Sequence, residues 1–213
     1  MEGLRCTHQI KLEPAAYERV RHETHADVQI ALVNCAVQSE KVLNLEKKGL
    51  GYAGAAALAN ALRGTAKPEW ISVSGNPIGN SGASALAWAL RGNSTLRCLY
   101  LYDCGFDLCG VTELAEALHG NSTLETIVLS FNKVGDAGAV ALANMLQSNS
   151  SLTEFIVSHA SIGDAGAVAL AKALRFNRTL KQITLSGNDI GEAGAAALAE
   201  ALQGNATLTK RCM

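Results

Sequence analysis

The sequence repeats itself every 28 residues, without a single insertion, from about residue 40 to its end. A fixed period of roughly 20–50 residues is typical of a solenoid or a propeller, so this feature constrains the fold more than any other. Residues that obey the repeat are expected to hold the structure, and exposed positions that vary between units are where binding specificity should lie. Three series with members 28 residues apart mark the repeat: Leu96, Leu124, Leu152, Leu180 and Leu208; Gly54, Gly82, Gly110, Gly138, Gly166 and Gly194; and Asn93, Asn121, Asn149, Asn177 and Asn205.

One unit, residues 124–151, illustrates what each repeat forms. It opens with the pattern L-x-x-L-x-L-x-x-N-x-V, in which Ile127 and Leu129 have the spacing of a short strand and point into the core. Asn132 follows the strand, where a buried amide side chain can bond neighbouring backbone groups of the turn. The second half of the unit has helical spacing, and Asp136 is the expected N-cap of that helix.

The same register places one strand and one helix in every unit. Parallel strands lie ~4.8 Å apart, whereas helices approach no closer than ~8–10 Å. The helical side is therefore longer, and the stack should curve with its sheet on the concave face. We expect strands near 42–46, 70–74, 98–102, 126–130, 154–158, 182–186 and 210–213, and helices near 52–63, 80–91, 108–119, 136–147, 164–175 and 192–203.

The motifs of the units are similar to those of a known repeat family. At the position of Asn132, every second unit has Asn. The residues in successive units are Lys48, Asn76, Cys104, Asn132, Ala160 and Asn188. This alternation, and the pairing of a strand with a full helix, resemble leucine-rich repeats of the ribonuclease-inhibitor type. The Asn-x-Thr-Leu turns and Gly-Asp-Ala-Gly-Ala helix starts are most similar to the repeats of NOD-like immune receptors. The resemblance implies a curved right-handed α/β solenoid, with a parallel β-sheet on the concave face and α-helices on the convex face.

The two ends of the chain depart from the repeat. We predict that residues 1–39 form a helical N-terminal cap, and that 40–213 contain six full repeats and a truncated seventh. The sequence stops within the seventh predicted strand, with Leu198 and Leu202 on a helix that has no successor. We expect the chain to be a fragment of a larger protein. The alternative is self-association through this uncapped C-terminal end, because an open strand edge is liable to pair.

Charge and hydropathy exclude several classes of partner. The net charge of −1 argues against nucleic acid and against a membrane surface as electrostatic partners. No apolar run approaches the ~20 residues that span a bilayer, and the N-terminus lacks a signal-peptide pattern, so we expect a cytoplasmic protein. The six cysteines form no paired framework and are expected to be buried free thiols. We predict no cofactor and no metal. A zinc site formed by Cys98, Cys104 and Cys109 is an alternative that lacks the usual Cys-x-x-Cys pair.

Other short motifs are better explained by the repeat. Asn-x-Ser/Thr tripeptides recur once per unit at the helix-to-strand turn, where Asn side chains bond the local backbone, so we interpret them as turns and not as glycosylation sites. His22 and His25 are three residues apart, whereas a metalloprotease motif needs a spacing of four. Trp88 lies on a predicted helix and is expected to pack between helices.

The residues between the inward leucines of each strand should face the concave surface, and there the units differ. Aromatic residues gather in the middle of this face, and exposed apolar patches with Trp and Tyr usually mark an interaction surface. The predicted patch consists of Trp70, Tyr100, Tyr102, Val128, Phe131 and Ile156, with a polar rim of Asp103, Glu154 and His159.

This face contains no convincing catalytic set, so the sequence predicts a non-enzymatic module that binds a protein partner with its concave face. It would be the recognition part of a larger receptor-like or regulatory protein. The alternative is a GTPase-activating or enzyme-inhibiting regulator with the same repeat fold. A designed or consensus-like repeat is a third interpretation, which the irregular concave residues disfavour.

Overall fold

The computed structural model describes residues 30, 33, 41–64 and 67–212. Strands and helices alternate along the described chain, and all seven strands form one parallel sheet in the order β1-β2-β3-β4-β5-β6-β7. The strands are β1 (Val42–Asn44), β2 (Trp70–Ser72), β3 (Cys98–Tyr100), β4 (Thr126–Val128), β5 (Glu154–Ile156), β6 (Gln182–Thr184) and β7 (Lys210–Cys212). The helices are α3 (Tyr52–Arg63), α4 (Gly79–Leu90), α5 (Leu108–Gly120), α6 (Gly135–Ser148), α7 (Asp164–Leu174) and α8 (Glu192–Gln203).

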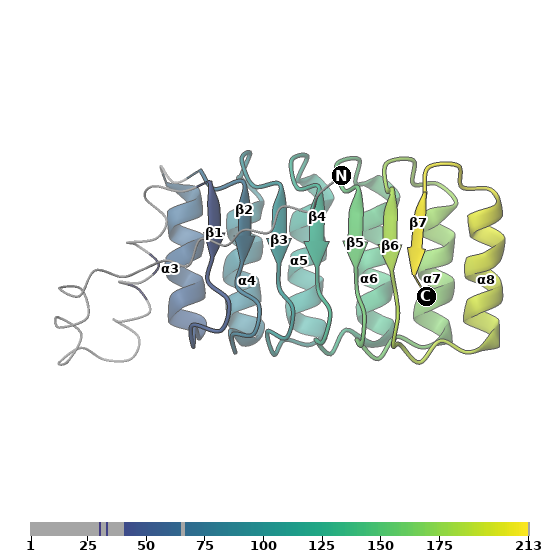
Figure 1. Ribbon diagram of the computed structural model, residues 1–213, viewed down its shortest axis with the longest axis horizontal. Helices are drawn as coiled ribbons and strands as arrows, with labels where there is room; N and C mark the ends of the chain where they lie inside the picture. Colours follow the sequence, from purple (N-terminus) through teal and green to yellow (C-terminus); the bar gives the residue numbers. More distant parts are fainter. Residues whose placement is uncertain (1–29, 31–32, 34–40, 65–66, 213) are drawn as a thin grey trace.

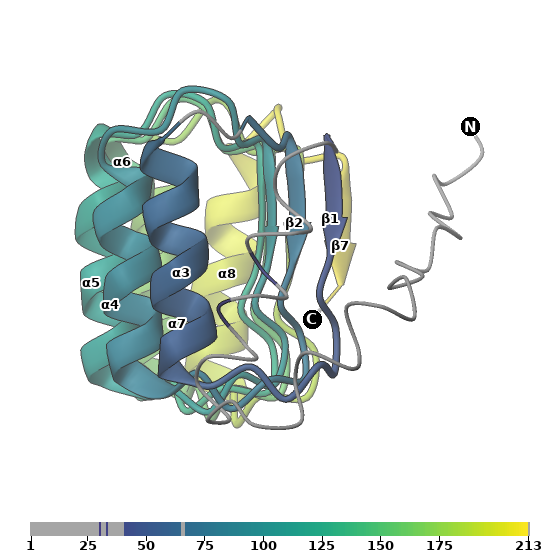
Figure 2. The same cartoon turned by 90° about the vertical axis from the view of Figure 1, so that its left-hand side faces the viewer.

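The elements form two layers, a row of strands and a row of helices (Figure 1). Viewed along the row, the end strands β1 and β7 project beyond the middle strands on the side away from the helices (Figure 2). The free face of the sheet is therefore concave and the helices cover its convex side, as the difference between strand and helix spacing predicts.

The strand register follows the sequence period. Each strand residue pairs with the residue 28 positions later, as in Leu99 with Ile127. The strands begin where predicted; β1 to β6 are two residues shorter than predicted, and β7 is described to Cys212. Backbone bonds between units nevertheless continue beyond them: the Leu45 amide donates to Ser72 O at 2.8 Å and the Lys47 amide to Ser74 O at 3.0 Å. The predicted and observed strands thus differ in where the ladder ends and not in register.

Leucines and small residues fill the space between the layers. Leu99, Ile127 and Leu129 are fully buried, as expected for inward strand positions. The repeated glycines let the helices approach closely. A Cβ atom at Gly110 would lie 2.9 Å from Cβ of Ala83 on α4 and 2.9 Å from Cβ of Phe106, which is too close for any side chain. These glycines therefore serve packing, as expected of residues that obey the repeat.

Asn side chains close the turns that follow alternate strands. The Asn132 amide donates to Leu129 O at 2.9 Å and to Leu101 O of the preceding unit at 2.7 Å. Its Oδ1 accepts from the Cys104 amide, also in the preceding unit, at 3.0 Å. The predicted role of this Asn is confirmed, and its bonds join two units as well as closing one turn.

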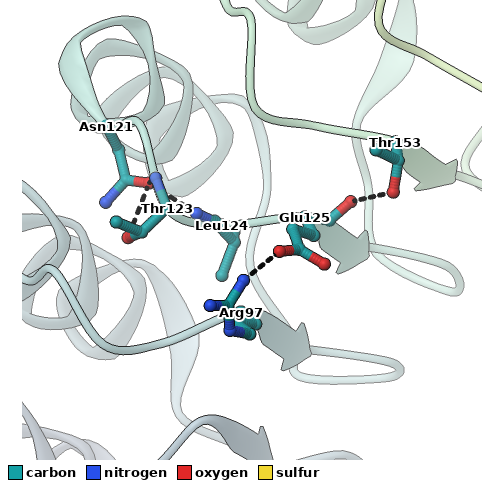
Figure 3. A network of polar contacts seen from close by, with 6 residues as sticks. All are labelled: Arg97, Asn121, Thr123, Leu124, Glu125 and Thr153. Atoms are coloured by element: carbon teal, nitrogen blue, oxygen red, sulfur yellow. Dashed lines mark hydrogen bonds and ion pairs between the residues drawn. The ribbon is translucent and has the colours of Figure 1, made fainter.

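A second series of Asn side chains occupies the helix-to-strand turns, and Figure 3 shows Asn121 in this position, with Thr123 and Leu124 as partners. Its amide donates to Leu90 O at 2.9 Å, at the C-terminal end of helix α4 in the preceding unit, where carbonyls lack intrahelical partners. The members of the series are all buried: Asn93, Asn121, Asn149, Asn177 and Asn205. A buried amide with both ends bonded is not accessible to a glycosyltransferase, which supports the interpretation of these tripeptides as turns.

The prediction that Asp136 caps its own helix is wrong. Helix α6 begins at Gly135, and no side chain accepts from its first amides. Instead Asp136 Oδ1 accepts from the amides of Gly163 at 2.7 Å and Gly166 at 2.9 Å, at the start of the next helix, α7. A carboxylate at a helix N-terminus interacts favourably with the helix dipole. The cap is thus supplied by the preceding unit, a relation that one unit taken alone does not reveal.

The division of the chain into 1–39 and 40–213 stays a prediction. Most of residues 1–39, including His22 and His25, lie outside the described residues. Of the two described positions in that segment, Val33 is helical and fully buried against the core, and Ile30 is helical and exposed.

Candidate interaction surface

The predicted concave patch divides into a half-buried part on the strands and an exposed part beyond them. On the strands, the rings of Trp70 and Tyr100 lie with centroids 5.0 Å apart, and both residues are partly covered. Partial burial raises the pKa of the Tyr100 hydroxyl, which stays neutral at physiological pH. Val128 was expected to be exposed, and this is wrong: only 7% of its surface is accessible, because Tyr100 and Ile156 flank it on the neighbouring strands.

The exposed part is a stack of three rings from three successive units. Tyr102 and Phe131 have centroids 4.7 Å apart, and Phe131 and His159 have centroids 4.4 Å apart, with tilted planes in both pairs. Tyr102 is 40% exposed and Phe131 is 45% exposed. Tilted aromatic pairs at this separation attract each other. The structure therefore brings three of the predicted residues together as one continuous row of rings, which we call the aromatic stack (Tyr102, Phe131 and His159).

The backbone at the aromatic stack is unusual. In six successive units, the third residue after the strand adopts a left-handed backbone conformation. These residues, here called the left-handed position, are Lys47, Gly75, Asp103, Phe131, His159 and Gly187. The φ angle is +60° at Phe131 and +49° at His159, against +69° at both glycines. A left-handed conformation costs an L-residue about 1–2 kcal/mol, and a bulky residue is rare there.

Glycine at one left-handed position makes room for the side chain of its neighbour. A Cβ atom at Gly187 would lie 2.3 Å from Cε1 of the His159 ring, so the imidazole occupies the space that a side chain would need. Gly75 accommodates Lys47 in the same way, with Cγ of Lys47 2.8 Å from the hypothetical Cβ. The imidazole of His159 is thus held between Phe131 and the bare backbone of Gly187.

The residues of the predicted polar rim do not lie together but are found at opposite ends of the strands. Asp103 is exposed and directly follows Tyr102, and no described residue forms an ion pair with it. Glu154 opens β5, at the opposite end of the strand from His159, and its Oε2 accepts from the Thr126 hydroxyl at 3.1 Å. Asp103 therefore lies beside the aromatic stack, and Glu154 lies with the half-buried part of the patch.

The comparisons with known proteins agree with this architecture. The family model described as "Leucine Rich repeat" matches four stretches of the chain, residues 71–87, 120–143, 148–171 and 176–199. These stretches coincide with strand-and-helix units of the structure. The fold is a leucine-rich-repeat solenoid. A search of curated protein sequences found no match.

Two solved structures are similar to this chain at low sequence identity. The actin-binding site 2 of leiomodin-1 is 18% identical, with a TM-score of 0.56, and the match covers 86% of this chain and 90% of that one. The C-terminal domain of tropomodulin from Caenorhabditis elegans is 18% identical, with a TM-score of 0.47, over 85% of this chain and 93% of that one. At this identity the likeness concerns the fold alone.

The convex face of the leucine-rich-repeat solenoid carries a groove that the sequence analysis missed. It has a volume of about 940 Å³ and runs between α4 and α5, with Tyr52, Trp88 and Leu108 among its lining residues. The expectation that Trp88 packs between helices is met only in part: it lines the groove between α4 and α5, but 45% of it is exposed, and the Arg63 guanidinium lies 3.7 Å from its ring centroid. Tyr52 and Leu108 stand at the repeat position that Asp136 occupies in its own unit. Large apolar residues at this position were the signal in the sequence for an apolar groove.

The cysteines only partly match the prediction of buried thiols. Cys104 is fully buried, and burial raises the pKa of its thiol to about 12. Cys98 is half-buried, and Cys109 and Cys212 are exposed, so the prediction is wrong for these two. No group of three potential metal ligands occurs among residues 30, 33, 41–64 and 67–212, and no helix within those ranges is long and apolar enough to cross a membrane.

Proposed function

We propose that this leucine-rich-repeat solenoid is a non-enzymatic module that binds a protein partner through the aromatic stack on the concave side. The observation that carries the proposal is the combination of exposure and strain at Phe131. The side chain is 45% exposed and its backbone is left-handed, at a position where Gly75 and Gly187 satisfy the same turn without a side chain.

Folding alone gives little reason for a phenylalanine at this position. An exposed ring contributes little burial, whereas a left-handed φ costs it about 1–2 kcal/mol relative to glycine. Strain of this kind is often found at functional positions. Aromatic side chains that become buried against a partner are common anchors of protein interfaces.

The remaining residues of the predicted patch extend the proposed surface. Trp70, Tyr100 and Ile156 continue it along the strands with partly exposed apolar atoms, and Asp103 adds a carboxylate beside the stack. A surface with an apolar centre and a polar edge is the usual arrangement of a protein interface. The narrower likenesses, to ribonuclease-inhibitor repeats and to NOD-like receptors, stay predictions.

Substitution of Phe131 by glycine tests the proposal, because it removes the ring and relieves the backbone strain together. Immobilised wild type and the Phe131→Gly variant would be compared for capture of purified candidate partners by surface plasmon resonance. The panel includes actin, since the leiomodin-1 domain of the same fold is titled an actin-binding site. It also includes small GTPases with a turnover readout, because accelerated hydrolysis would favour the regulatory alternative.

A matched control distinguishes loss of the surface from loss of the fold. Val140→Ala trims an exposed apolar side chain on α6, on the helical side of the molecule. We expect Phe131→Gly to weaken binding at least about tenfold, the ordinary effect of removing an anchor residue, and Val140→Ala to leave the same binding unchanged. Equal affinity of Phe131→Gly and wild type for a bound partner would contradict the role of the stack.

A further inference from the structure

The edge formed by the helix-to-strand turns changes its electrostatic character along the solenoid. In the first units, oppositely charged residues on successive turns neutralise each other. Lys41 Nζ lies 2.7 Å from Glu69 Oε1, and Arg97 pairs with Glu125, as Figure 3 shows. At the corresponding position of later units stand Thr153, Lys181 and Thr209, so the charge of Lys181 has no partner on the neighbouring turns.

Several more cations gather on the same part of the edge. Arg175 is the C-cap residue that follows α7, Arg178 lies in the turn after it, and Lys181 immediately precedes β6. Lys210 opens β7 beside Lys181, and its amide donates to Lys181 O at 3.1 Å. Lys172 lies in the last turn of α7, so these residues lie on or next to the turns before β6 and β7. The two turns form the upper edge of Figure 1 toward β7.

Acidic residues compensate only a small part of this charge. Arg175 pairs with Glu200 on α8. Lys172, Arg178, Lys181 and Lys210 form no ion pair with any described residue. The helix dipole accounts for cations at the end of α7, since it favours positive charge at a helix C-terminus. It does not account for Arg178, Lys181 and Lys210, which lie outside the helix.

An exposed phenylalanine stands in the middle of these cations. Phe176 is 72% exposed and directly follows Arg175. The equivalent residues of the other units are small: Gly64, Gly92, Gly120, Ser148 and Gly204. The turn itself therefore does not need an aromatic residue, and the ring contributes almost no burial where it is. Arginine and exposed aromatic residues are the types most enriched at protein interfaces.

We infer that this surface, the basic corner (Lys172, Arg175, Phe176, Arg178, Lys181 and Lys210), binds an acidic polypeptide segment that carries an apolar residue. Carboxylates of the segment pair with the unpaired cations, and the arginines can engage them with two parallel hydrogen bonds. The apolar residue covers the ring of Phe176. The basic corner lies on a different edge of the solenoid from the aromatic stack, so this inference does not depend on the function proposed above.

The test uses a defined probe and the whole chain. Fluorescence anisotropy would measure binding of a fluorescein-labelled peptide of glutamates with one central leucine, and of the same peptide with glutamine in place of glutamate. We expect saturable binding of the glutamate peptide that weakens with added salt, since salt screens exposed charges. The glutamine peptide should not bind.

Three variants locate the site. Arg178→Gln/Lys181→Gln should weaken binding of the glutamate peptide about fivefold, the scale of two exposed ion pairs, and Phe176→Ser should weaken it further by removing the apolar contact. Arg97→Gln is the matched control, since it removes a cation of the same edge that is already paired with Glu125, and it should bind as wild type does.

Three outcomes would overturn the inference. One is an absence of saturable peptide binding, and another is equal weakening by Arg97→Gln and by the basic-corner variants. The third is binding to phosphatidylcholine vesicles that contain phosphatidylserine without binding to the peptide, which would assign the basic corner to a membrane surface. Phe131→Gly should leave peptide binding unchanged, and this separates the inference from the function proposed for the aromatic stack.

Discussion

The two turns of each unit satisfy their structural demands in different ways. At the helix-to-strand turn, a buried Asn bonds the same groups in unit after unit, and the residue type does not change from Asn93 to Asn205. At the left-handed position of the strand-to-helix turn, the demand is a dihedral angle, and lysine, glycine, aspartate, phenylalanine and histidine all meet it. A demand for hydrogen bonds fixes the residue, whereas a demand for a dihedral angle leaves the side chain free for other use.

The largest effect is expected where the hydrogen bonds are removed. Asn149 donates to Leu118 O at 2.8 Å and to Asn121 O at 3.1 Å, and its Oδ1 accepts from the amide of Leu152 at 2.9 Å. Asn149→Ala leaves these buried backbone groups without partners and should lower the free energy of unfolding by about 3 kcal/mol. Urea denaturation measures the change, and Asn144→Ala, at an exposed site on α6, is the control.

An intermediate effect is expected at a glycine of the left-handed position. Gly187→Ala adds a Cβ in the space of the His159 ring and an unfavourable φ, which together should lower the free energy of unfolding by about 2 kcal/mol. Combining it with His159→Ala should recover the part due to the clash. An additive double variant would show that the ring is not confined by Gly187.

A smaller effect is expected at Phe131, and it separates stability from binding. Phe131→Gly loses the ring contacts with Tyr102 and His159 but relieves the left-handed strain, so the free energy of unfolding should change by less than about 1 kcal/mol. Thermal unfolding monitored by circular dichroism checks this. A large loss of stability would mean that the stack serves the fold, and the contrast between the two turns would disappear.

The smallest effect is expected at the exposed ion pairs of the helix-to-strand edge. The hydrogen bond from Lys41 holds the pKa of the Glu69 carboxyl below its usual 4.5. A lowered folded-state pKa means that the pair stabilises the fold above the usual pKa, and that this contribution is lost as pH falls through the lowered value. An NMR titration of Glu69 in wild type and in Lys41→Gln should show the pKa return upward in the variant.

The sequence period predicted the architecture well because the repeat itself carries the register. Strand starts, helix positions and the roles of Asn132 and the buried Asn series all follow from residue type and spacing within one unit. The features that were missed depend on distances between units. Asp136 reaches the next helix, Val128 is covered by its neighbours, and Trp88 lies in a groove between two helices. The left-handed position had a signal in Gly75 and Gly187, but nothing in spacing alone indicates how rings at that position contact one another.

The uniform 28-residue step has a consequence for how the molecule could be rebuilt. Because the Asn of the strand-to-helix turn recurs in every second unit (Asn76, Asn132 and Asn188), removal of two consecutive units rejoins turns of the same kind. Such a deletion would move everything beyond it closer by about two strand spacings, ~10 Å, without changing the surfaces themselves. The number of units between any two binding surfaces of the solenoid thus sets the distance between them.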